Sequence, residues 1–163
     1  MQSSKVPAQR EQEELLVEWA NPENVAPFGA LLTAGEDGTP FGDVDAKLEI
    51  SGGVPRFYIM TLFSRPLRVS HITRHMCVTQ CLASMEGKEW IIVLAPPADT
   101  PDPGRMRALR FSGAQALCMS VGTWHAGPLT LQPSCNFINL ELSDTNIVDH
   151  DTVQLGKTYE LAF

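Results

Sequence analysis

The most constraining feature of this chain is a succession of short apolar runs separated by turn-forming residues. Gly35-Glu36-Asp37-Gly38 and Ser51-Gly52-Gly53 are two of these turns, rich in residue types that reverse the backbone. Many short strands at this spacing are typical of a β-sandwich or a β-barrel. No linker rich in Ser, Gly or charge divides the chain, and no repeat recurs at a fixed period. We therefore predict one all-β domain over residues 1–163, a jelly-roll type β-barrel with a few short helices.

The individual elements follow from the same runs. Asn21 and Pro22 are the expected cap and first residue of a helix that Pro27 limits to about one turn. Asp102 and Pro103 are the expected start of a second short helix, which extends through Arg110. The run at 15–19 is short enough for a strand, although residues 10–14 favour a helix. Strands are expected at 29–33, 44–50, 56–63, 67–73, 78–83, 89–95, 115–120, 137–142 and 158–162.

Charge, hydropathy and cysteine usage exclude several classes of protein. A net charge of −7 and a pI near 5.0 argue against a nucleic-acid partner. No apolar run approaches the roughly 18 residues of a membrane span, and residues 1–5 lack the apolar core of a signal peptide. We expect a cytoplasmic protein with no membrane partner and with reduced, buried thiols at Cys77, Cys81, Cys118 and Cys135. Cys77 and Cys81 are expected on one face of a strand as core residues.

One candidate site residue is His125, which stands at an expected bend of the backbone. Gly122 precedes the Trp124-His125 pair, and Gly127-Pro128 follows it. An imidazole held at a bend beside a large aromatic side chain suits a metal ligand or an acid–base group. The alternative is a half-buried histidine that simply packs on Trp124.

A second candidate group lies upstream. On a strand, His71, Thr73 and His75 share one face, and Gln80 follows. Two imidazoles and an amide oxygen gathered in a barrel could hold a divalent metal with positions open for substrate. The alternative for His71 is a solvent-facing histidine. Imidazole ligands accept zinc, nickel, manganese or iron, so these residues do not identify the metal.

The order of these residues resembles that of a known superfamily. His75, Gln80 and Gly87 resemble the first motif of the cupin superfamily, and the segment from Gly122 to His125 resembles the second. A finer resemblance is to the ureidoglycolate lyase family, formerly called ureidoglycolate hydrolase, which has a cupin-like β-barrel.

The finer resemblance runs through nearly the whole chain. Two departures stand out: Ala126 replaces a second histidine of the family, and Glu141-Leu142 replaces Asp-Arg. The matching positions are 24–29, Arg65, His75, Thr79-Gln80, 90–97, Pro101-Asp102, Arg107-Ala108-Leu109, Thr123-Trp124-His125, Pro128-Leu129, and Asn136-Phe137 where the family has Asp-Phe.

The resemblance implies a lyase that splits ureidoglycolate into glyoxylate and urea, in the degradation of purines through allantoin. It implies His125 as base or metal ligand, completed by His75 and Gln80, and Glu141 as a further catalytic carboxylate. The metal expected on His75, Gln80 and His125 is a divalent ion such as nickel, zinc or manganese.

The implied substrate is a small-molecule carboxylate. Arg65 would clamp its carboxylate, or else form a surface ion pair. Trp124 would exclude water from the substrate or pack the core, and His71 is the third expected substrate contact. His150, between two aspartates, is expected in an exposed polar turn.

Two other classes of function remain open from the sequence. One is a small-ligand binding protein or sensor on the same barrel, and the other is a metal-dependent lyase or isomerase acting on another small hydroxy acid. Cupin barrels often pair through edge strands, so a homodimer is expected.

Overall fold

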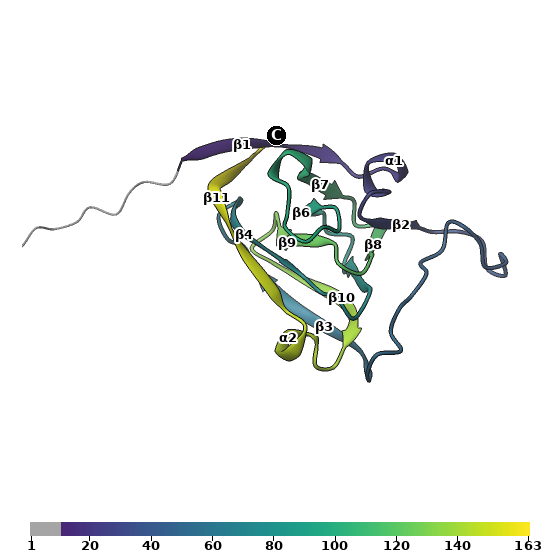
Figure 1. Cartoon of the computed structure of the whole chain (residues 1–163). Helices are drawn as coiled ribbons and strands as arrows, with labels where there is room; N and C mark the ends of the chain where they lie inside the picture. Colours follow the sequence, from purple (N-terminus) through teal and green to yellow (C-terminus); the bar gives the residue numbers. More distant parts are fainter. Residues whose placement is uncertain (1–10) are drawn as a thin grey trace, which may run out of the picture.

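Strands dominate the computed structural model, which describes residues 11–163 (Figure 1). Six of them close into a barrel in the order β1 (Gln12–Trp19), β11 (Asp151–Ala162), β4 (Arg68–Arg74), β9 (Trp124–Thr130), β6 (Trp90–Ala95) and β7 (Arg107–Phe111). Five more form a sheet in the order β2 (Gly29–Thr33), β8 (Gln115–Met119), β5 (Gln80–Ser84), β10 (Ser134–Leu142) and β3 (Pro55–Phe63). The predicted all-β barrel with a few short helices is confirmed.

Strand β6 joins the barrel to the five-stranded sheet, because both of its faces are buried. Trp90, Ile92 and Leu94 belong to a core cluster that includes residues of β5, β8 and β10, where the ring of Trp90 stacks on Phe111 with centroids 4.4 Å apart. The alternate residues of the strand, Ile91 among them, pack with residues of β4, β9 and β11. A strand covered on both sides has a continuous apolar sequence, as this one does.

Two of the helical segments are single turns whose starts agree with the sequence. In α1 (Pro22–Val25) the Asn21 side chain accepts from the Asn24 backbone, and the Asn24 side chain accepts in return from the Asn21 backbone. Asp102 caps a 3₁₀ turn at Pro103–Arg105. The predicted extension of this second helix through Arg110 is wrong. Its residues form β7, which pairs with β6 on one side and β1 on the other.

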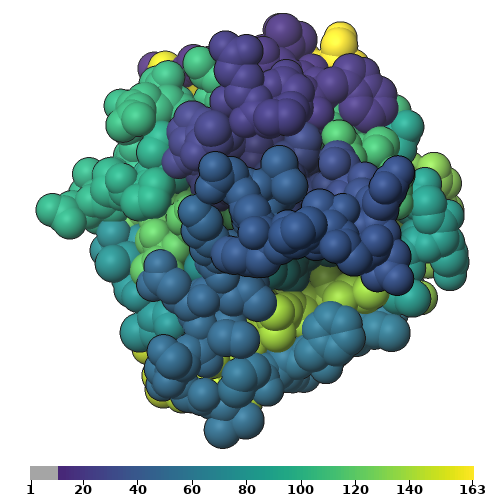
Figure 2. Space-filling view, turned by 90° about the vertical axis from the view of Figure 1, so that its right-hand side faces the viewer, coloured from purple at the N-terminus to yellow at the C-terminus, as the bar shows by residue number. Residues whose placement is uncertain are grey.

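The predicted strand at 44–50 is also wrong. It lies within the segment between β2 and β3, which crosses the face seen in Figure 2 below α1. Its side chains alternate in polarity, but Val44 is 77% exposed, and the segment pairs with no strand of either sheet. The Thr79 amide donates to the Glu49 carbonyl at 3.0 Å, and the Glu49 amide donates to the Thr79 hydroxyl at 2.9 Å, so the contact does not extend into a ladder.

Three further features differ from the sequence-based expectation. Cys77 is exposed and precedes β5, so it is not a core residue, whereas Cys118 is buried as expected. His125 itself lies within a strand, β9, although the expected turn at Gly122 does precede that strand. A helix that was not expected, α2 (Thr145–Val148), precedes β11. None of the helices within residues 11–163 is long and apolar enough to cross a membrane.

Candidate functional site

Two histidines from distant parts of the chain lie side by side next to the barrel strands β4 and β9. His125 lies on β9, and His75 directly follows β4; their ring centroids are 5.0 Å apart with 54° between the planes. The two strands are paired at Thr73, which lies opposite His125. The Gly122 amide donates to the carbonyl oxygen of His75 at 2.7 Å. The structure therefore brings together two of the expected site residues.

Backbone carbonyls define which nitrogen of each ring carries the proton. The Nδ1 of His75 lies 2.5 Å from the carbonyl oxygen of Asp149, and the Nδ1 of His125 lies 3.4 Å from that of Thr123. A carbonyl only accepts, so Nδ1 carries the hydrogen, and Nε2 of the neutral ring retains its lone pair. This is the tautomer that a metal ligand or a proton acceptor requires.

Burial strongly disfavours the protonated form of His125. Its side chain is buried, and loss of hydration lowers its pKa to about 3, with the coulombic interaction with His75 acting in the same direction. The ring is therefore neutral at pH 7. Its Nε2 lone pair is available to a metal ion or to a proton of a substrate.

These histidines lie in a cleft with two lobes, which share Arg65, His125, Gly127 and His150. We call them the arginine lobe and the amide lobe. The arginine lobe, about 290 Å³, is otherwise lined by Arg68, Val69, His71, Thr73, Ala126 and Thr152. The polar residues that otherwise line the amide lobe, about 370 Å³, are Tyr58, His75, Gln80, Asn139, Glu141 and Asn146.

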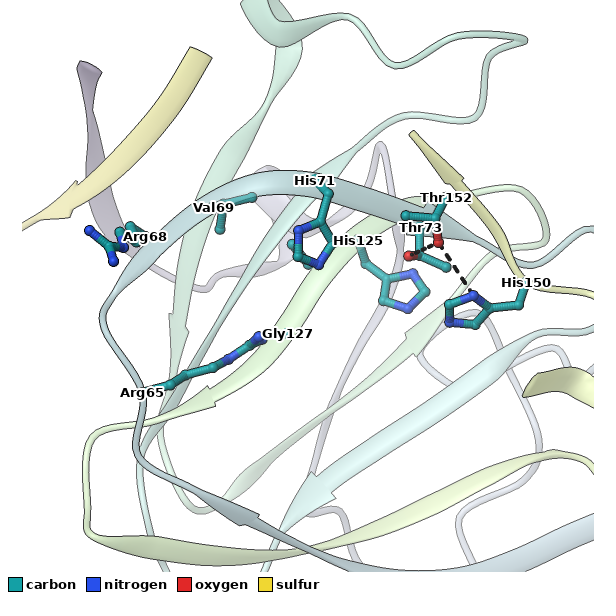
Figure 3. Close-up of a pocket in the computed structure, with 10 residues that line it drawn as sticks. Arg65, Arg68, Val69, His71, Thr73, His125, Gly127, His150 and Thr152 are labelled. Carbon is teal, nitrogen blue, oxygen red and sulfur yellow. Dashed lines mark hydrogen bonds between the residues drawn. The ribbon is translucent and has the colours of Figure 1, made fainter. Parts of the chain in front are cut away.

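The arginine lobe is positively charged. Two arginines line it and no carboxylate does, and no ion pair to Arg65 is present in the described part of the chain. In Figure 3 the side chain of Arg65 extends toward Gly127, on the side of the cleft that His71 also faces. An unpaired guanidinium can bind a carboxylate through two parallel hydrogen bonds. Arg65 has no acidic partner among residues 11–163, so the alternative of a surface ion pair is not observed.

The amide lobe is organised around the carboxylate of Glu141, which is 1% exposed. Its Oε1 accepts from the Tyr58 hydroxyl and from Asn146 Nδ2, each at 3.0 Å. Its Oε2 accepts from Gln80 Nε2 at 2.9 Å and from Asn139 Nδ2 at 3.4 Å. Four donors occupy the four lone-pair positions of a carboxylate. Glu141 therefore orients its neighbours, and it has no lone pair left to accept a proton from a substrate.

Tyr58 is fixed as a donor by this carboxylate. Burial is the main cause that raises the pKa of its phenol, and the charge of Glu141 raises it further. The hydroxyl donates to Glu141 and accepts from Asn139 Nδ2 at 3.0 Å.

Gln80 is held by the same network but keeps one free acceptor. Its Nε2 donates to Glu141 and, at 3.2 Å, to Asn139 Oδ1. The side chain is 7% exposed, and its Oε1 has no hydrogen-bond partner among residues 11–163. A buried acceptor without a partner is unusual in a folded protein. The lobe thus contains an amide oxygen that is fixed in orientation and unsatisfied.

One expected site residue is not brought to the cleft. Trp124 is fully buried in the barrel core, its Nε1 donates to the Ala98 carbonyl at 3.0 Å, and Arg74 stacks over its ring. Along a strand, successive side chains point to opposite faces, so Trp124 faces away from the side that His125 occupies. Of the two roles expected for Trp124, the structure shows core packing, and the residue does not line either lobe.

Four residues of the cleft were missed in the sequence. Tyr58, Asn139 and Asn146 carry no motif; Tyr58 and Asn139 act through contacts between β3 and β10, and Asn146 reaches Glu141 from helix α2. The exposed ring of His150 lies 5.6 Å from that of His75, centroid to centroid. The sequence contains one indication of its role, which is the small number of histidines: the chain has four, and all four line this cleft.

A barrel with imidazoles, unpaired guanidinium groups and an amide network at one cleft has the features of a site for a small polar carboxylate. Comparison with known proteins identifies the family. Residues 45–162 match the family described as ureidoglycolate lyase, and the chain belongs to that family.

Curated relatives carry the same name. The ureidoglycolate lyase of Pseudomonas aeruginosa (strain LESB58) is 29% identical over 150 residues, covering 79% of this chain and 83% of the relative. That of Azotobacter vinelandii (strain DJ) is 27% identical over 130 residues, covering 72% and 78%.

Solved structures show a more distant likeness. RmlC from Streptococcus suis in complex with dTDP-D-xylose has a TM-score of 0.39 at 9% identity and covers 55% of this chain and 44% of its own. The Mn(II)-containing oxalate decarboxylase of Bacillus subtilis has a TM-score of 0.40 at 13% identity, covering 63% and 24%.

The two departures from the family's sequence pattern lie in different surroundings. Ala126 lines the arginine lobe, and His150, from the segment between α2 and β11, supplies an imidazole to the same lobe. Leu142 is buried at 3% exposure and does not line either lobe, whereas Glu141 beside it does. The first departure therefore changes the cleft, and the second changes the packing next to it.

Proposed function

We propose that this protein cleaves ureidoglycolate into glyoxylate and urea, as a step in the degradation of purines through allantoin. Membership of the ureidoglycolate lyase family is the main support. The single observation that carries the proposal is the composition of the cleft: Arg65, His125 and Gln80 offer it a cation, a neutral imidazole and an amide oxygen.

The reaction needs one proton to move from oxygen to nitrogen. The substrate carbon bears a hydroxyl and a ureido group. As the hydroxyl proton is removed, the oxygen forms a carbonyl, the C–N bond breaks with its electrons on nitrogen, and that nitrogen takes a proton to release urea. The Nε2 lone pair of one of the two histidines, His125 or His75, is the proposed acceptor of the hydroxyl proton, and the imidazolium that forms there is the proposed donor to the leaving nitrogen.

Arg65 is the proposed clamp for the substrate carboxylate. A guanidinium offers a planar pair of donors that matches a carboxylate, and the arginine lobe supplies further positive charge from Arg68. A carboxylate held there would lie beside His125, which borders both lobes. His71 is the proposed second contact in this lobe.

A divalent metal ion remains part of the proposal. No group of three or more His, Cys, Asp or Glu side chains among residues 11–163 is arranged to hold one. His75, His125 and the unsatisfied Gln80 Oε1 fit as three neutral ligands. A bound nickel, zinc or manganese ion would polarise the substrate hydroxyl as a Lewis acid.

The test is release of urea from ureidoglycolate by the purified protein, with glyoxylate formed in equal amount. Activity is measured before and after removal of metal with a chelator, and again after adding back nickel, zinc or manganese. A protein that gains thermal stability with the ligand but releases no urea would be the small-ligand binder. Turnover of another hydroxy acid without urea would indicate the other lyase or isomerase.

We also propose a cytoplasmic homodimer. Strand β3 is an edge of the five-stranded sheet, and Phe57, Ile59 and Phe63 on it are each more than half exposed. All four cysteines are free thiols, which suits a reducing compartment. The mass measured by light scattering after size exclusion tests the dimer.

A further inference from the structure

The two lobes of the cleft differ in the chemistry that they offer to a ligand. The arginine lobe presents Arg65 and Arg68 and no carboxylate, so it favours a negative charge. The amide lobe presents side-chain amides and a phenol held around the carboxylate of Glu141. A ligand with a carboxylate at one end and a neutral group of donors at the other would match both lobes at once.

The amide lobe has a buried hydrogen-bond acceptor that is left unsatisfied. All four lone-pair positions of Glu141 are taken, and Tyr58 both donates and accepts within the network. Gln80 Oε1 is the buried side-chain acceptor left without a partner in the described chain. Its orientation is set, because a flip of the amide would bring Oε1 against the carboxylate of Glu141.

We propose that Gln80 Oε1 accepts a hydrogen bond from the terminal NH₂ of the ureido group, and so selects substrates that end in urea. This inference rests on the proposed function. The ureido end then occupies the amide lobe and the carboxylate occupies the arginine lobe. His125, which borders both lobes, faces the carbon between them.

An acceptor built for an N–H discriminates against a ligand that lacks one. A methyl group in place of the NH₂ leaves Oε1 unpaired and buried, and sites of this kind reject such analogues strongly. An amide oxygen has two lone pairs, so a hydrogen bond to the ureido group leaves one for a metal ion.

The test compares two unreactive ligands that differ only at this group. N-carbamoylglycine lacks the hydroxyl of ureidoglycolate but keeps its ureido end, and N-acetylglycine replaces the terminal NH₂ by a methyl. Binding of both is measured by calorimetry to the wild type, to Gln80→Met, which removes the amide, and to Gln12→Met. Gln12 lies exposed on β1, away from the cleft, and serves as the matched control.

The wild type and Gln12→Met should bind N-carbamoylglycine at least about tenfold more tightly than N-acetylglycine. In Gln80→Met this ratio should fall to within about twofold, through loss of affinity for N-carbamoylglycine. Equal affinities in the wild type would overturn the inference without any variant, and so would a failure of the wild type to bind either ligand. A ratio that survives in a folded Gln80→Met would also overturn it.

Urea release from ureidoglycolate is measured on the same wild-type protein. Release of urea together with equal affinities for the two ligands would overturn the assignment of Gln80 and leave the proposed function standing. A tenfold preference for N-carbamoylglycine without any urea release would retain the binding role of Gln80 and reject the lyase.

Discussion

The backbone amide of Gly122 donates to the carbonyl oxygen of His75 at 2.7 Å, and this bond joins the two segments that carry His75 and His125. Gly122 makes it from a left-handed conformation, with φ at +80°. The separation of the two imidazoles therefore depends on a position that favours glycine.

We expect Gly122→Ala to destabilise the protein by about 1–2 kcal/mol, because an alanine is strained at this φ. Its Cβ would also lie 3.3 Å from the sulfur of Met76. The lyase activity should fall more than the stability accounts for, since the loop that supports His75 must shift. Urea denaturation and steady-state kinetics measure both. Gly35→Ala is the control, since a Cβ there meets nothing within 4 Å; equal effects of the two changes would contradict the argument.

Replacing His125 by asparagine should reduce kcat/KM for ureidoglycolate by about 100-fold or more, because the Nε2 lone pair is lost. Asparagine retains a polar side chain at the buried position, so the variant should still fold. Circular dichroism and the melting temperature check this. Turnover within a few-fold of the wild type would remove His125 from the site.

The depressed pKa of His125 predicts a loss of stability in acid. In the unfolded chain the imidazole titrates near 6.5, and in the folded protein near 3. Above pH 6.5 both states are neutral, so the group contributes no pH dependence. Between pH 6.5 and 3 only the unfolded state binds the proton, and the free energy of unfolding should fall by about 1.4 kcal/mol per pH unit.

His125→Asn provides the comparison for this pH dependence. Denaturation of both proteins is measured at pH 7.5 and at pH 5. The free energy of unfolding should fall less in the variant, because the variant lacks the one proton that the unfolded wild type takes up at His125. Identical slopes would mean that His125 is protonated in the folded protein.

Arg65→Ala should raise KM for ureidoglycolate by about tenfold or more, because the carboxylate loses a charged, two-point contact. Arg65→Lys should recover only part of the loss, since an ammonium cannot form two parallel bonds. Arg105→Ala, exposed on the 3₁₀ turn and outside the cleft, is the matched control. If Arg65→Ala leaves KM unchanged, the substrate carboxylate binds elsewhere.

The sequence predicted those parts of the fold that depend on local pattern. The apolar run of β6 and the caps at Asn21 and Asp102 were recognisable because each is decided by neighbouring residues. The segments at 44–50 and 107–110 were misassigned for one reason. Whether a segment forms a strand depends on whether it pairs with a neighbouring strand in the fold, and that information is tertiary.

The candidate site divides in the same way. His75, Gln80 and His125 were found because they form an ordered motif, and Arg65 because it follows the same order. Tyr58 and Asn139 were not, since they reach the cleft through strand alternation and cross-strand contacts with Glu141. For Trp124 the sequence left core packing and a substrate contact open, and strand alternation decides for packing, because the residue next to a site histidine on a strand faces the opposite side.

The saturation of Glu141 predicts that its charge is needed for structure. In Glu141→Gln one carboxylate oxygen becomes an NH₂ that faces two donors, either Tyr58 and Asn146 or Gln80 and Asn139. A buried donor opposed by donors leaves several groups unsatisfied, so the free energy of unfolding should fall by about 2–3 kcal/mol. Urea denaturation measures this.

Two comparisons separate the network from a simple loss of charge. Glu14→Gln, on the exposed surface of β1, should leave stability within about 0.5 kcal/mol of the wild type. Tyr58→Phe removes one of the four donors without adding another, so it should cost less than Glu141→Gln, about 1 kcal/mol. Glu141→Gln should also weaken the preference for N-carbamoylglycine, because Gln80 loses the partner that orients its amide. A variant that kept both its stability and this preference would show that Glu141 does not hold Gln80 in place.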